Sequence, residues 1–299
     1  NASRPIRDSE VDSCATIGRT PIEFRVGTDA LAVVINPEND WATDVTLEEL
    51  AAIFTAEKWS DVNPEWPDEA ILRYIPGTDS GTFDYFVEAV FEEDPEPVLT
   101  AANTQFSEDD NVLVIGVEGS PYATGFFGYA YYSENADALG IMDIEGVEPS
   151  FETVEGGDYA LARPLFIYSD ATIMAEKPQV AAYVNYFLSS VNEVIEEVGY
   201  FPASEAALNQ AKAAAADAMG LAVPSMDSGE AAEPTEEASE EAAATAVMLP
   251  EVDPLTVEGD VVTAGSSTVF PLAEAVGERF YDEGYGGTIT IDSIGSGAG

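Results

Sequence analysis

Residues 71–86 constrain the fold of this chain more than any other stretch. A short β-branched and aromatic run ends at Pro76-Gly77, and a loop of small hydroxyl residues follows. From Phe83 onward, apolar side chains recur at helical spacing, so the pattern predicts a strand, a tight loop and a helix. Such a junction suits an anion, because the N–H groups of the first helical turn lack partners and lie at the positive end of the helix dipole.

The same strand, hydroxyl loop and helix pattern recurs along the chain, and this helps decide whether the loop only caps a helix or binds an anion. On their own, Ser80 and Thr82 are more simply interpreted as helix caps, as in most proteins. However, residues 261–280 repeat the strand, hydroxyl loop and helix, and residues 288–299 begin a third case. Residues 1–6 make a fourth, with Asp8 placed to cap a following helix. Several hydroxyl-bearing helix starts in one chain indicate one shared anion.

The charge of the chain limits its partners. Asp and Glu number 57 against 10 Lys and Arg, giving a formal net charge of -47. This argues against nucleic acid or an anionic membrane as partner, and it is typical of a protein that works in high salt. Because the charge also repels anions at long range, an anion site must act through local donors in a partly desolvated cleft.

Missing residue types exclude several kinds of site. The chain has no histidine, which excludes a Ser-His-Asp hydrolase and a histidine-rich metal site. A single cysteine, Cys14, excludes a thiolate cluster and an internal disulfide; it is either a small buried hydrophobe or a residue that has lost its partner. Without a long apolar segment or an initiating methionine, the chain is expected to be soluble and processed or trimmed.

Elsewhere the sequence predicts alternating strands and helices. Thr46 and Glu49 form a capping box for one helix, and Trp59 and Trp66 are expected in the loop after it. The other predicted strands are 21–26 and 31–35, separated at 27–29, then 112–115 and 162–168; the other predicted helices are 180–191 and 204–220. Residues 221–250 form an acidic Glu/Ala/Pro tract of a kind usually left disordered, unless it is partly helical or held down.

Four motifs together resemble the phosphate-binding loops of the periplasmic phosphate-binding proteins of Pst-type ABC transporters. They are residues 264–271, 294–299, 1–6 and 77–83. The resemblance covers almost all of the chain except the acidic tract. It implies an α/β fold with two lobes, the type II periplasmic-binding-protein fold, with the ligand in the cleft between them. One lobe would contain 1–33, 162–220 and 251–299, and the other 34–161, with crossings near 30–34 and 159–164.

The order of the segments differs from that family, where the segment resembling 251–299 comes first. Three explanations are open: a circular permutant, a segment cut from a tandem array, or a strand-exchanging assembly. In the first, residues 251–299 fold back onto their own body. In the others they complete a neighbouring subunit, which is a form of domain swapping.

The resemblance also implies which residues contact phosphate: Ser3, Arg4, Asp79, Ser80, Gly81, Thr82, Ser267, Thr268, Val269 and Ser296. Relatives often place an arginine before the loop 80–82, where this chain has none. Our hypothesis is that Arg4 supplies the charged donor. Asp79 would accept the proton of hydrogen phosphate and so reject sulfate. Alternatively, Arg4 and Asp79 only form a salt bridge across the cleft.

The function implied is capture of inorganic phosphate for uptake, with an ABC-transporter permease as partner and without catalysis, cofactor or metal. The location implied is extracellular or at the cell surface, with a lipid-anchored precursor as one form. The alternative is a structural or filament-forming surface protein that self-associates through 221–299. A phosphatase ranks third, because the chain has no histidine and no clear metal cluster.

Overall fold

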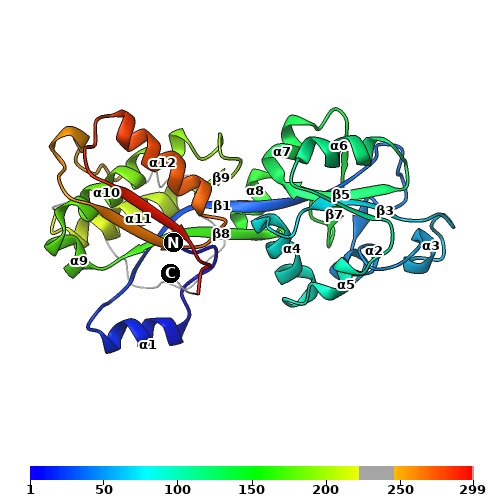
Figure 1. Ribbon diagram of the computed structural model, residues 1–299, viewed down its shortest axis with the longest axis horizontal. Coiled ribbons are helices and arrows are strands. Elements are labelled where there is room, and N and C mark those ends of the chain that lie inside the picture. The colour runs from blue at the N-terminus through cyan, green and yellow to red at the C-terminus, as the bar shows by residue number, and fades with distance from the viewer. Residues whose placement is uncertain (222–245, 298–299) are drawn as a thin grey trace, which may run out of the picture. The chain divides into compact units, whose positions relative to one another are not determined.

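The computed structural model describes residues 1–221 and 246–297 and divides the chain into two units (Figure 1). Unit 1 contains Asn1–Val26, Leu165–Val194 and the described part of Ala203–Gly299, and unit 2 contains Gly27–Pro164 and Ile195–Pro202. One boundary follows Val26, before the expected crossing at 30–34, and the other follows Pro164, at the edge of the expected 159–164. Residues 195–202, expected in the first lobe, lie in unit 2 because β9 (Phe201–Pro202) pairs with β1 (Ile22–Ile35). Most of the expected acidic linker, 221–250, lies outside the described residues.

Unit 2 is built on a mixed sheet in the order β4-β3-β5-β1-β6. Strand β3 is parallel to β4 and β5, whereas β1 is antiparallel to β5 and β6. Successive side chains of a strand point to opposite faces. Accordingly, Leu31 and Val33 of β1 pack with α2, α4 and α5, and Ala32 and Val34 pack with α6 on the other face (Figure 1). The bounds are β3 (Leu72–Pro76), β4 (Thr104–Ser107), β5 (Ala123–Gly128), β6 (Gly140–Ile141), α2 (Leu47–Ile53), α4 (Gly81–Phe91), α5 (Glu96–Leu99) and α6 (Asp110–Glu118).

The remaining elements of unit 2 are short. They are β2 (Asp44–Val45), α3 (Trp59–Val62), α7 (Tyr129–Glu134), β7 (Asp143–Ile144) and α8 (Phe151–Gly156). The predicted capping box is confirmed at α2, where the N–H of Glu49 donates to Thr46 Oγ1 at 3.1 Å. The loop predicted around Trp59 is wrong at that residue. Trp59 begins α3, is fully buried, and donates its indole N–H to the carbonyl of Tyr122 at 3.1 Å.

Two strand predictions are also wrong. Strand β1 is continuous over 14 residues and is not broken at 27–29. Gly27 lies inside it because β9 approaches closely: a Cβ there would lie 2.8 Å from the carbonyl oxygen of Phe201. Residues 112–115 belong to α6, whose N-cap Asp109 accepts from the N–H of Asn111 at 3.0 Å. A run of four apolar residues does not by itself distinguish a strand from a buried helical segment.

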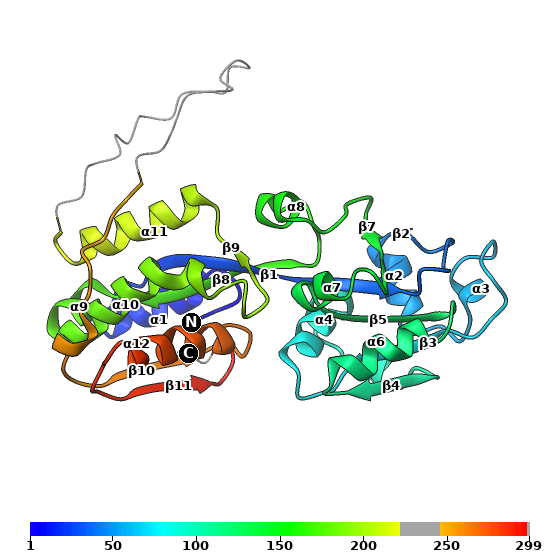
Figure 2. The same cartoon turned by 90° about the horizontal axis from the view of Figure 1, so that it is seen from above.

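Unit 1 contains a parallel pair of strands, β10 (Val261–Gly265) and β11 (Ile289–Ser293), with α12 (Phe270–Asp282) beside them (Figure 2). Helix α12 buries Leu272, Val276 and Phe280, which recur every four residues on one face. The ring of Phe280 packs against Tyr183 and Tyr186 of α10 (Pro178–Ser190). Residues 261–293 thus form a β-α-β unit that is fastened to the body of unit 1.

The first residues of the chain join this β-α-β unit to strand β8 (Ala162–Ser169). Ala2 pairs with Phe166 of β8, and the amino group of Asn1 donates to the carbonyl of Ala264 in β10 at 3.0 Å. The predicted strand at 162–168 and the predicted helices at 180–191 and 204–220 are confirmed by β8, α10 and α11 (Glu205–Ala218).

The other elements of unit 1 are α1 (Asp8–Thr16), α9 (Ala171–Glu176) and two 3₁₀ turns, η1 (Val191–Glu193) and η2 (Pro254–Thr256). The N-cap of α1 is Arg7, not Asp8, because the carboxylate of Glu10 accepts from the N–H of Arg7 at 2.8 Å. Cys14 is a half-buried free cysteine on this helix. Within residues 1–221 and 246–297, no helix combines the length and apolar character needed to cross a bilayer.

Candidate anion-binding site

The loop after β10 is held by a serine that the sequence analysis did not single out. Ser266 accepts hydrogen bonds from the N–H groups of Thr268 and Val269 at 3.2 and 3.4 Å. Thr268 and Val269 are buried, whereas Ser267 is exposed. Gly265 has φ +144°, and a Cβ at this position would lie 2.0 Å from the carbonyl oxygen of Asn1. Only glycine fits where the loop meets the first residue of the chain.

Two distant segments converge on this loop. The N–H groups of Ile294 and Gly295 donate to the carbonyl of Gly265 at 2.9 and 2.8 Å. The N–H of Ser3 donates to Ser296 Oγ at 3.2 Å, and the two hydroxyl oxygens are 3.3 Å apart. Unit 1 therefore gathers hydroxyl-bearing residues from three of the four predicted motifs, although Ser3 and Ser296 are separated by 293 positions.

Arg4 lies beside this cluster and brings a positive charge to it. Its Nη2 atom is 3.5 Å from where a Cβ of Gly297 would stand. The guanidinium pairs with both carboxylate oxygens of Glu10, at 2.7 and 3.0 Å, and donates to the carbonyl of Pro5 at 3.1 Å. The hydrogen bond from Arg4 is the largest cause that lowers the pKa of Glu10 to about 2. The predicted charged donor is therefore present, but it is engaged by a neighbouring carboxylate.

The fourth predicted motif lies in unit 2, at the start of α4. Ser80 is the N-cap, and its Oγ accepts from the N–H of Thr82 at 3.2 Å. The backbone before it is tied down, because Gly77 donates to the carbonyl of Ser107 and accepts from the N–H of Ser80, both at 3.1 Å. Asp79 is exposed at the tip of the loop. The capping interpretation of Ser80 is thus correct, and it is compatible with anion binding because a serine that accepts a hydrogen bond still has its own hydrogen to donate.

One residue beside the unit 2 loop was missed by the sequence analysis. Arg163, in β8, donates through Nη2 to the carbonyl of Gly81 at 3.3 Å and through Nε to Asp29 Oδ2 at 3.0 Å. Its guanidinium carbon lies 3.9 Å from the centroid of the Tyr85 ring. Arg163 and Asp29 are only 8% and 4% exposed. The signal available in the sequence was an arginine in an otherwise apolar predicted strand.

Opposing charges act on the Asp84 carboxyl near this loop. Burial raises the pKa of the Asp84 carboxyl in the first turn of α4, Arg163 opposes that rise, and Asp79 adds to it. The positive charge of Arg163 therefore acts on groups at the start of α4, although the side chain itself is buried.

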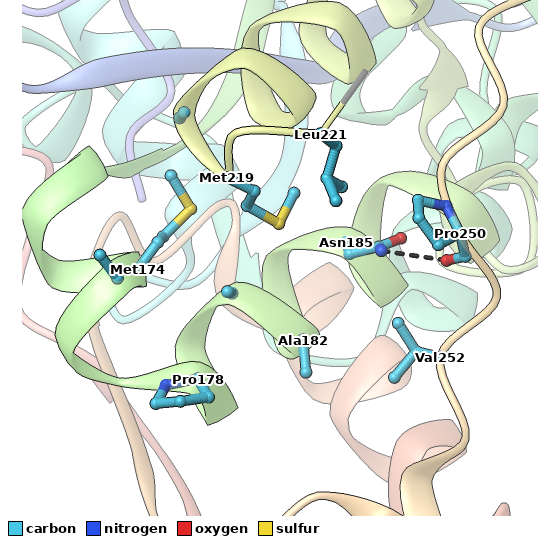
Figure 3. Close-up of a pocket in the computed structure, with 11 residues that line it drawn as sticks. Met174, Pro178, Ala182, Asn185, Met219, Leu221, Pro250 and Val252 are labelled. Carbon is cyan, nitrogen blue, oxygen red and sulfur yellow. Dashed lines mark hydrogen bonds between the residues drawn. The ribbon is translucent and has the colours of Figure 1, made fainter. Parts of the chain in front are cut away.

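A separate cavity in unit 1 lacks the chemistry of an anion site. It has a volume of about 360 Å³ and is lined mainly by apolar side chains, including Met174, Met219 and Leu221 (Figure 3). The side-chain amide of Asn185, which also lines the cavity, donates to the carbonyl of Pro250 at 3.0 Å. This hydrogen bond holds the segment that leads into β10. Across the described ranges, no three acidic or cysteine side chains are grouped as a metal site would require.

Comparison with known proteins assigns the family. Residues 1–191 match the model of the PBP superfamily domain. The chain belongs to the PBP superfamily. A crystal structure of a possible phosphate binding protein from Planctomyces limnophilus is 39% identical, with a TM-score of 0.67 over 73% of this chain and 80% of that one. The α/β periplasmic-binding-protein fold class expected from the sequence is confirmed.

Curated relatives are similar over much of the chain. Protein SphX of Synechocystis sp. is 41% identical over 223 residues, which is 71% of this chain and 66% of that protein. The phosphate-binding protein PstS of Staphylococcus saprophyticus is 32% identical over 207 residues, or 67% of this chain and 63% of that protein. This PBP superfamily chain therefore spans just under two thirds of the length of the curated relatives it matches.

Proposed function

We propose that this chain is a phosphate-binding protein that captures inorganic phosphate for uptake and does no chemistry on it. The observation that carries the proposal is the meeting of Ser3, Ser296 and the loop 265–269 in unit 1. Hydroxyl groups gathered beside the start of a helix, at the positive end of its dipole, are suited to a tetrahedral oxyanion. Relatives named as phosphate-binding proteins support phosphate as that anion.

The residues proposed to contact phosphate fall in two sets. Unit 1 contributes Ser3, Arg4, Ser267, Thr268, Val269 and Ser296, and unit 2 contributes Asp79, Ser80, Gly81 and Thr82. The bidentate contact of Arg4 with Glu10 holds the guanidinium in a fixed orientation. Asp79 is proposed to accept the proton of hydrogen phosphate, which sulfate lacks at neutral pH.

Isothermal titration calorimetry with phosphate, using sulfate as the competing anion and high salt to screen the acidic surface, tests this function. Ser80→Ala and Ser296→Ala should each weaken phosphate binding by about tenfold, the usual effect of losing one hydrogen bond to a charged group. Ser293→Ala, at the exposed end of β11, is the matched control and should bind as the unmodified chain does. Asp79→Asn should narrow the preference for phosphate over sulfate. Absence of phosphate binding by the unmodified chain would end the proposal.

We also propose that residues 251–299 complete the site of their own chain. Support comes from the segment that leads into them, where Val247 donates its N–H to Asn209 Oδ1 and Pro250 accepts from Asn185, both at 3.0 Å. Ser3→Cys and Ser296→Cys together, in a chain with Cys14→Ser, should form an intramolecular disulfide that leaves a monomer on a non-reducing gel. Disulfide-linked dimers or ladders would instead favour exchange of 251–299 between subunits and the filament-forming alternative.

The proposed setting follows from the proposed function. A receptor for uptake works outside the cytoplasm and delivers its ligand to an ABC-transporter permease, and a lipid anchor on a longer precursor would keep it at the surface. Labelling of intact cells with a membrane-impermeant reagent should reach this protein. Protection from that reagent would contradict the surface location.

A further inference from the structure

Arg163 occupies a place that helix stability does not explain. It donates to the carbonyl of Gly81, the first residue of α4. A cation near the N-terminus of a helix opposes the helix dipole, and burying a guanidinium costs further free energy. Asp29 offsets part of both costs by accepting from Nε at 3.0 Å. A buried positive charge kept at the positive end of a helix suits a site that receives an anion.

The contact with Gly81 reaches Ser80 through one peptide unit. The carbonyl of Gly81 and the N–H of Thr82 belong to the same planar trans peptide, so they point in opposite directions. Fixing the carbonyl with Arg163 therefore fixes the N–H of Thr82, which donates to Ser80 Oγ at 3.2 Å. The Ser80 hydroxyl, held as an acceptor on one side, has its hydrogen to donate on the other. Hydrogen bonds in such a chain polarise and strengthen one another.

We propose that Arg163 is a positioning residue for the unit 2 anion loop, acting through the Gly81–Thr82 peptide to aim and polarise the Ser80 hydroxyl toward phosphate. This inference rests on the proposed function. The guanidinium does so from a fixed orientation, because the Asp29 carboxylate and the Tyr85 ring hold it on two sides. Asp29 lowers the positive potential that Arg163 brings to the loop, so the two partners affect the anion in opposite directions.

The opposite effects of Arg163 and Asp29 on the anion distinguish a positioning role for Arg163 from a purely structural ion pair. Arg163→Gln should weaken phosphate binding severalfold, and by no more than the roughly tenfold expected for Ser80→Ala, because Arg163 acts on the anion through Ser80. Asp29→Asn keeps an acceptor oxygen for Nε but removes the negative charge, so it should bind phosphate at least as tightly as the unmodified chain. Arg163→Lys keeps the charge without the fork geometry and should fall between the two. Lys58→Gln removes one exposed positive charge from the same unit and is the control.

The measurements are calorimetric phosphate affinity, thermal unfolding to show that each variant is folded, and the ¹⁵N–¹H resonance of Thr82 without ligand. Arg163→Gln should shift the Thr82 resonance, whereas Lys58→Gln should leave it in place. Equal losses of affinity in Arg163→Gln and Asp29→Asn, or no loss in Arg163→Gln, would overturn the inference. If the unmodified chain binds no phosphate, the proposed function fails separately. An unmoved Thr82 resonance would then overturn the link from Arg163 to the loop as well.

Discussion

Arg73 offers a direct test of what holds unit 2 together. It lies on β3, directly before the anion loop, and its side chain is fully buried. Nε donates to the carbonyl of Ile53 at 2.8 Å, Nη1 donates to that of Ala102 at 2.7 Å, and Nη2 donates to that of Ala56. Ile53 ends α2, so the cation also sits at the negative end of that helix dipole. One side chain thus ties together α2, β3 and the chain entering β4.

The expected effect of Arg73→Met follows from two opposing contributions. Each hydrogen bond from a charged group contributes roughly 1.5–3 kcal/mol, so three give at least about 4.5 kcal/mol. Against this, desolvation lowers the pKa of Arg73 to about 10, which corresponds to a burial cost of roughly 3.5 kcal/mol. The variant should therefore lose about 1–5 kcal/mol of unfolding free energy. Since the group stays charged in both states well below pH 10, the loss should not change between pH 5 and 8.

Urea unfolding followed by tryptophan fluorescence measures the unfolding free energy of unit 2. All three tryptophans, Trp41, Trp59 and Trp66, lie in unit 2, so the signal reports that unit alone. Lys58→Met removes an exposed positive charge from the same unit and should leave the unfolding free energy close to that of the unmodified chain. A loss below about 1 kcal/mol for Arg73→Met would refute the assignment of Arg73 as the tie between these elements.

Three further perturbations examine unit 1. Gly265→Ala places a Cβ 2.0 Å from the carbonyl oxygen of Asn1 at φ +144°, and calorimetry should show phosphate binding weakened by at least about a hundredfold as the loop moves. Glu10→Gln removes a carboxyl whose pKa is lowered to about 2 by Arg4. The stabilisation that this carboxylate gives is present above pH 4.5 and is lost as the pH falls toward 2. Acid titration by circular dichroism should therefore show unit 1 of the variant unfolding at a higher pH. Phe280→Ala empties a fully buried site on α12 and should cost about 3–5 kcal/mol in chemical denaturation followed by near-ultraviolet circular dichroism; a cost under 1 kcal/mol would mean that α12 is not fastened to the body.

The sequence predicted best where local chemistry decides the structure. The loop at 77–82 and the loop at 265–269 were located because glycine, hydroxyl residues and a following apolar repeat each act within a few residues. Prediction was poorer where distant contacts decide. Gly27 looked like a strand break, although it is the point where β9 approaches β1. Residues 112–115 looked like a strand because four apolar residues fit either interpretation.

The predicted binding residues show the same division. Motifs identified Ser3 and Ser296, and the hydrogen bond between them could not be deduced from positions so far apart in sequence. Arg163 was missed because its meaning depends on Asp29 and Gly81, which approach it only through the sheet and the start of α4. Glu10, which engages Arg4, was likewise not anticipated, because the sequence analysis considered only Asp8 in that segment.

The long separation between Ser3 and Ser296 has a consequence for how the protein is made. Residues 27–202 supply every strand of the unit 2 sheet, so this unit can fold as soon as that stretch has left the ribosome. Asn1 and Ser3 cannot make their contacts with Ala264 and Ser296 until that later segment is synthesised. Contacts of such high sequence separation form slowly. During synthesis, the bridge between Ala2 and Phe166 of β8 is therefore available first, and the hydroxyl cluster of Ser3 and Ser296 is assembled only after unit 2 can fold.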